Sequence, residues 1–75
     1  MDIYIAICCD RHIDEVVKVF TMPEAAIAYA KRFAEENAGY PEGIEEIQIT
    51  GWLYYATYSC EGDNVRVIQD VLDPS

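Results

Sequence analysis

Hydrophobic and polar positions along the chain predict strands at both ends and one helix between them. Residues 2–9 are apolar on both faces, with isoleucines on one side and Tyr4 and Ala6 among the residues on the other. A strand of this kind is expected inside a sheet and not at its edge. The β-branched segment 15–20 follows a short polar connection. It predicts a returning strand, so that the two segments form a hairpin.

A helix is predicted over about 22–37. Thr21 can cap its first turn, and Glu24 stands three residues later, in the spacing of a capping box. Pro23 lies in the first turn, where a missing amide hydrogen is tolerated. The apolar residues repeat at spacings of three and four and define one buried stripe: Ala26, Ile27, Ala30, Phe33 and Ala34. The segment 37–39 supplies a stop signal for this helix.

The rest of the chain predicts further strands. Residues 46–59 are aromatic and β-forming, and they indicate either one long strand kinked at 50–51 or two short strands. A turn then leads to a final strand over 65–72, and residues 73–75 are expected to fray. The predicted fold is a single α+β domain over 1–75, in the order ββαββ. One helix packs on one face of a roughly four-stranded antiparallel sheet.

One helix cannot cover such a sheet completely, because about 16 residues span only about 24 Å in length and 10 Å in width. If the isoleucine face of residues 2–9 meets the helix, an aromatic face stays open. Tyr and Trp suit interfaces because they bury apolar area and keep a polar group. We therefore predict an interface, suited to a homodimer, at Tyr4, Trp52, Tyr54 and Tyr58. The alternative is that tyrosines simply tolerate a solvated sheet face.

Charge changes this picture further. Fourteen acidic residues against five basic ones give a net charge of −9 over 75 residues. Because phosphates are repelled by such a surface, direct binding to nucleic acid or to an anionic membrane is not expected. One cluster of acids contains no base: Glu35, Glu36, Glu42, Glu45 and Glu46. These carboxylates could mimic phosphates and occupy a basic groove on a protein partner. Ordinary solubility is the alternative interpretation.

Candidates for catalysis or metal binding are weak. Asp10, His12 and Asp14 alternate in a short polar segment but lack the ligand number of a cation loop. The cysteines together with His12 lack the paired spacing of zinc ligands. A pair of Cys9 and His12 lacks a third group to orient it. We expect no catalytic residue, no metal and no cofactor, and hence no enzyme.

The compartment follows from the cysteines and the first residues. Cys8, Cys9 and Cys60 are odd in number and show no disulfide framework spacing, which is typical of reduced thiols. A bridge from Cys60 to either of the others is the alternative. The first residues lack the features of a secretory signal, and no apolar run has the length of a membrane span. We expect a cytoplasmic protein.

In length, charge and order of elements the chain resembles a known class of proteins. The features that match are the acidic balance, the initial hairpin, the helix that starts at 21–24 and the aromatic strands. They are similar to those of the small acidic proteins that phages and other mobile elements use against host defence, of the anti-CRISPR or anti-restriction type. The resemblance implies an inhibitor that binds a nuclease complex in the host cytoplasm and blocks its nucleic-acid site. It assigns a role to no individual residue.

Two hypotheses result from the sequence. The first is a protein-binding inhibitor of a host nucleic-acid-handling defence complex, acting through the acidic cluster. The second is a self-associating structural or accessory protein, which forms a homodimer through its aromatic sheet face.

Overall fold

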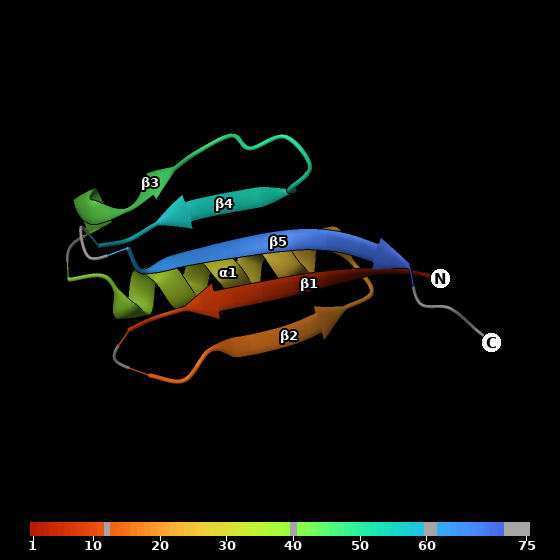
Figure 1. The fold of residues 1–75 in the computed structure, drawn as a ribbon, viewed down its shortest axis with the longest axis horizontal. Helices are drawn as coiled ribbons and strands as arrows, with labels where there is room; N and C mark the ends of the chain where they lie inside the picture. The colour runs from red at the N-terminus through yellow and green to blue at the C-terminus, as the bar shows by residue number, and fades with distance from the viewer. Residues whose placement is uncertain (12, 40, 60–61, 72–75) are drawn as a thin grey trace.

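The computed structural model describes residues 1–11, 13–39, 41–59 and 62–71. Within them the chain forms one α-helix, a short 3₁₀ turn and a five-stranded antiparallel sheet of order β2-β1-β5-β4-β3 (Figure 1). The elements in chain order are β1 (Asp2–Cys9), β2 (Val16–Phe20), α1 (Pro23–Asn37), η1 (Pro41–Gly43), β3 (Glu45–Glu46), β4 (Tyr54–Thr57) and β5 (Asn64–Val71). The expected α+β class, with one helix on an antiparallel sheet, is confirmed.

The sheet differs from the predicted one in its number of strands. Of the two alternatives for the segment 46–59, the structure shows two short strands and not one long kinked strand: the chain turns at Thr50 and Gly51 and pairs as β3 and β4. Gly51 has a φ of 95°, a left-handed conformation that glycine adopts without steric cost. The roughly four strands expected are therefore five. β1 lies between β2 and β5, in the sheet interior, as its two apolar faces predicted.

The helix α1 begins at Pro23 and places a stripe of alanines against the sheet. Ala26, Ala30 and Ala34 are completely buried, as the spacing predicted. The predicted cap is wrong: Met22 occupies the N-cap position, and no side chain caps the helix. Pro23 has no amide hydrogen to satisfy, so one of the helix's unpaired donors is already absent.

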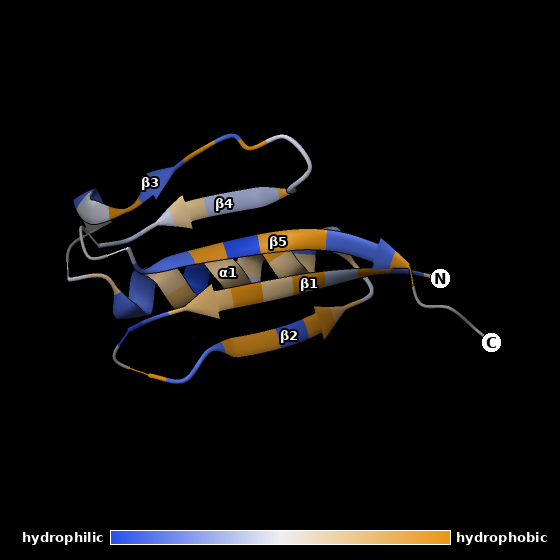
Figure 2. Ribbon diagram, in the orientation of Figure 1, coloured by the Kyte–Doolittle hydropathy of each residue, from blue (hydrophilic) through white to orange (hydrophobic). Residues whose placement is uncertain are grey.

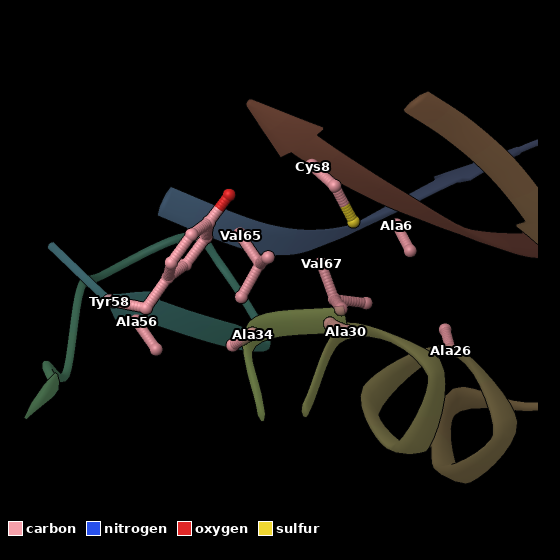
Figure 3. Packing of buried hydrophobic residues seen from close by; sticks show 9 residues of the cluster. All are labelled: Ala6, Cys8, Ala26, Ala30, Ala34, Ala56, Tyr58, Val65 and Val67. Carbon is pink, nitrogen blue, oxygen red and sulfur yellow. The ribbon is translucent and has the colours of Figure 1, made fainter. Parts of the chain in front are cut away.

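The core between α1 and the sheet consists mostly of small side chains. In Figure 3 the alanines of α1 face side chains of the sheet, which are themselves alanine, cysteine or valine. The buried apolar residues are Ala6, Cys8, Ala26, Ala30, Ala34, Ala56, Tyr58, Val65 and Val67. Small residues on both sides let the helix lie close to the strands, and larger rings close the margins of this layer. Phe20 stacks near Tyr29, with ring centroids 5.6 Å apart.

The helix covers the face opposite to the one expected. Ala6 and Cys8 point from β1 into the core, whereas the isoleucines of β1 point away from α1. The expectation that the isoleucine face meets the helix is therefore wrong. The physical reason is size. A helix that presents alanines lies close to the sheet, and on β1 Ala6 and Cys8 leave room for it where the larger isoleucines would not.

Candidate functional site

The isoleucine side of the sheet is its open side. In Figure 1, α1 lies behind the strands, and none of the described elements lies in front of them. The aliphatic side chains on this side come from β2, β1 and β5, and Figure 2 shows apolar segments of these strands side by side. They are Val17, Val19, Ile3, Ile5, Ile7 and Ile68. We call this set the open apolar face.

Strand register makes the open apolar face continuous. Ile5 pairs with Val19 on one side and with Ile68 on the other, and Ile7 pairs with Val17. Paired residues of neighbouring strands point to the same side of a sheet, with their Cβ atoms about 5 Å apart. Val17 and Val19 are 51% and 59% exposed, respectively. The face is thus one surface of aliphatic side chains and not a set of scattered residues.

An aromatic group extends this surface toward β4. The rings of Trp52 and Tyr55 lie 5.2 Å apart, and the guanidinium carbon of Arg66 lies 5.5 Å from the centre of the Trp52 ring. Arg66 pairs with Ile7 on one side and Tyr55 on the other, so it belongs to the open side. A cation held over an indole face is attracted by the ring. Arg66 therefore keeps its positive charge at the margin of the open apolar face.

The open side also contains a negative charge. Asp70 lies on the same face of β5 as Arg66, with Ile68 between them. Among the described residues of β1, β2, β4 and β5, these are the charged side chains whose register places them on the open side. The six residues of the open apolar face are uncharged, but acids lie at its margins. Besides Asp70, the carboxylate of Glu15 accepts the thiol of Cys9, and the pairing of Glu45 with Thr57 places that acid on the same side of the sheet.

The predicted aromatic interface is not on this side. Tyr4, Tyr54 and Tyr58 all pack with the core on the helix side, and Tyr58 is only 3% exposed. Of the predicted residues, Trp52 is on the open side, where it packs against Tyr55. The aromatic residues are therefore divided between the two faces. The open side that the sequence predicted to be aromatic is mainly aliphatic.

The buried Tyr58 and the partly buried Tyr54 each have a carboxylate partner. The hydroxyl of Tyr54 donates to Glu46 at 2.6 Å, and that of Tyr58 donates to Asp10 at 2.6 Å. Burial, and then these hydrogen bonds, raise the pKa of both phenols above its ordinary value. Lys31 lies 5.5 Å from the centre of the Tyr54 ring and 3.9 Å from Glu46. Lys31 therefore joins α1 to the sheet, whereas the bond of Tyr58 to Asp10 joins the end of β4 to the segment after β1.

The structure separates the predicted acidic cluster into parts. Glu35, Glu45 and Glu46 line one surface hollow together with Ile44. Glu36 lines a different hollow, beside Tyr29, Arg32 and Phe33. Glu42 is exposed in η1. Three of the five predicted acids thus share one site, which we call the acidic hollow.

A polar cluster near the end of β1 was missed at the level of sequence. Asp63 is buried, and its carboxylate accepts hydrogen bonds from the backbone amide of Arg11 and the hydroxyl of Ser59, both at 2.9 Å. The acid therefore ties the segment after β1 to the β4–β5 turn. Gly62, with a φ of 95°, directly precedes it. A glycine–acid pair in a turn is the sequence signal for such a role.

The thiols are poorly suited to nucleophilic chemistry. Burial raises the pKa of the Cys8 thiol to about 11, and burial together with a hydrogen bond to Glu15 raises the pKa of Cys9. Both thiols are therefore protonated near neutral pH. Since the thiolate is the reactive form of cysteine, they are unreactive there. Both are free thiols. His12 and Cys60, which completed the candidate metal and catalytic sets, lie outside the described residues.

Comparison with models of known protein families, with curated proteins and with solved structures gave no match. Over the described residues, no helix combines the length and the apolar character needed to cross a bilayer. The same part of the chain holds no group of three or more side chains placed to bind a metal ion.

Proposed function

We propose that this chain is a non-enzymatic protein-binding module that docks through its open apolar face. The observation that supports the proposal is the continuity of that face across β2, β1 and β5. Three strands about 4.8 Å apart, each contributing about five residues of 3.3 Å, cover on the order of 250 Å² of sheet. With the group around Trp52, the surface reaches about 300 Å². That is the size of the largest apolar patches on typical monomers, which are often functional.

The size of the face also indicates how tightly it binds. At about 25 cal/mol per Å², covering about 300 Å² contributes about 7 kcal/mol. Association costs roughly 4–15 kcal/mol in lost translational and rotational freedom. The open apolar face alone therefore supports a weak contact. Polar groups at its margin, Arg66 and Asp70 among them, decide whether that contact becomes specific.

Replacing Val17 and Val19 by lysine is expected to abolish capture of a binding partner from a lysate. Both side chains are exposed, so the fold tolerates the change, while two charges then have to be desolvated in the interface. Affinity capture with the tagged chain is the measurement. The control is the single substitution Val71→Lys, which also replaces an exposed valine by lysine, because Val71 is 62% exposed and lies outside the open apolar face. Equal capture by both variants would contradict the proposal.

A second candidate function is supported by the acidic hollow. We propose as the alternative that the chain inhibits a host nucleic-acid-handling defence complex. Glu35 and Glu45 would contact basic residues that otherwise hold phosphates. Two carboxylates brought together from α1 and β3 increase the local negative potential and attract a basic groove. The net charge of −9 adds long-range steering of the two proteins.

Reversing the charges of Glu35 and Glu45 to lysine is expected to abolish inhibition by this second mechanism. Glu46 is left unchanged because it accepts the hydrogen bond of Tyr54. The matched control reverses Glu36 and Glu42, which lie outside the acidic hollow and change the net charge equally. The measurement is displacement of labelled DNA from a purified CRISPR effector or restriction nuclease, over a series of salt concentrations. Equal loss of inhibition in both variants would show that only the net charge matters, and would contradict a specific role of the acidic hollow.

A further inference from the structure

We propose that the protein covering the open apolar face is a second copy of this chain, packed face to face about a two-fold axis. This inference rests on the proposed docking function and names its partner. The axis runs across the strands along one row of the sheet, formed by Val19, Ile5 and Ile68. Each protomer thereby covers the aliphatic surface of the other.

Strand register defines this row. Ile5 is paired with Val19 of β2 and with Ile68 of β5, so the three side chains form a line perpendicular to the strands. When a protein packs against its own copy through one face, the same patch is used on both sides, and the two-fold axis lies in the plane of the contact. An axis along this row places each of the three residues against its counterpart. The centre of the interface is then entirely aliphatic.

The residues beside the row also become complementary. On β1, Ile7 of one protomer lies over Ile3 of its partner. On β5, Arg66 and Asp70 are the residues paired with Ile7 and Ile3, respectively. The same axis therefore places Arg66 of one protomer over Asp70 of its partner, and does so twice. Packed sheets lie about 10 Å apart, a separation that an arginine and an aspartate can span together once Arg66 turns away from the Trp52 ring that it covers in the single chain.

The charged residues favour an axis across the strands over an axis parallel to them. A two-fold axis parallel to the strands through β5 would place Arg66 over Arg66 and Asp70 over Asp70. Like charges facing each other in an interface are unfavourable, so that arrangement is disfavoured. The axis across the strands turns the same two residues into two ion pairs. The open side is thus self-complementary in one orientation.

The distribution of acids bears on whether a second copy can approach a chain with a net charge of −9. Glu15 and Glu45 lie beside the open side near the Cys9 end of the sheet, so the axis across the strands places those of the two protomers at opposite ends of the dimer. Glu35 lies on α1, Asp63 lies in the turn before β5, and both are outside the open apolar face. Two copies therefore meet without bringing these acids together. The contact area is below the roughly 800 Å² per partner of a standard interface. The dimer is therefore expected to be weak and readily reversible, and to form mainly at high protein concentration.

Sedimentation velocity of the full chain over a range of concentrations tests this dimer. Arg66→Glu is expected to weaken association about tenfold or more, because it places a negative charge over Asp70 of the partner. Asp70→Arg should act similarly through Arg66. The double variant, Arg66→Glu with Asp70→Arg, exchanges the two charges and should restore association to within about threefold of the original. Circular dichroism shows whether each variant is folded.

Arg32→Glu provides the matched control, since it makes the same change in net charge on an exposed position of α1. It should leave dimerisation almost unchanged. A strictly monomeric chain at high concentration would overturn the inference. So would a folded double variant that associates no better than the single ones. If the chain is monomeric but the lysine variant of Val17 and Val19 still loses a captured protein, only the choice of partner is wrong. Failure of both tests would remove the docking function as well.

Discussion

Replacing Ala30 by leucine is expected to lower the free energy of unfolding by about 2–3 kcal/mol. Ala30 is completely buried in the alanine stripe of α1, where it meets Val67 and other core residues of the sheet. Three additional carbons have no space there, so the helix must move away from the sheet or the strands must shift. A chain of 75 residues has about 4–11 kcal/mol of stability in total, so the expected loss is a large part of it.

Urea denaturation measures this loss, and thermal denaturation should show a fall in Tm of about 10–20 °C. The matched control is Ala28→Leu, which makes the same change on the exposed side of the same helix. Because alanine and leucine are both good helix formers, the control should be nearly neutral. Equal stability of the two variants would show that α1 does not pack tightly through Ala30.

Raising the pH above about 9 is expected to destabilise the protein progressively. Burial raises the pKa of Cys8 from 9.0 to about 11, and burial with a carboxylate hydrogen bond raises the pKa of Tyr54 and Tyr58. The folded state therefore keeps protons that the unfolded chain releases. The stabilisation is complete below the unfolded pKa of each group and is lost as the pH rises toward the folded one. Each group contributes up to about 1.4 kcal/mol per pH unit in its window.

Urea denaturation at intervals between about pH 8 and pH 11 measures this dependence. The thiol acts first, from about pH 9 to 11, and the phenols act above about pH 10. Tyr58→Phe should reduce the slope in the upper range, although it also removes the hydrogen bond to Asp10 and lowers stability at neutral pH by about 1–3 kcal/mol. A stability that stays constant up to about pH 11 would contradict the prediction.

Local patterns in the sequence were sufficient for most of the elements. Pro23 and the spacing of the alanines placed the helix within a residue of its observed start, and the alternation in residues 2–9 matched β1 at both ends. These signals act between residues close in sequence. The strand order depends on contacts between distant segments, which explains why the insertion of β5 between β1 and β4 was not predicted.

The face that meets the helix was also predictable in principle, but from size and not from hydrophobicity. Both faces of β1 are apolar, so alternation could not choose between them. Ala30 requires a close partner surface, and Ala6 and Cys8 provide one, whereas Ile5 does not. Comparing side-chain volumes on the helix and the strand would have indicated the correct side, and with it the open apolar face.

The acidic site could be predicted only in part. Glu35 and Glu36 are adjacent in sequence but point in different directions, because successive helical residues are separated by about 100°. They line different hollows. Glu45 joins Glu35 only through the position of β3 at the sheet edge. The grouping of Glu35 with Glu45 depends on the tertiary fold, so the clustering of acids in the sequence was not enough to predict it.

The two edges of the sheet bear on how far assembly can proceed. β3 is only two residues long and consists of Glu45 and Glu46, so it offers an incoming strand little to pair with and repels an acidic one. β2, at the other edge, carries Lys18 in the middle of its five residues. Two copies joined along β2 around that residue would bring the two lysines together. Edge-to-edge growth into filaments is thus disfavoured at both ends, so the proposed association through the sheet face would close at two copies.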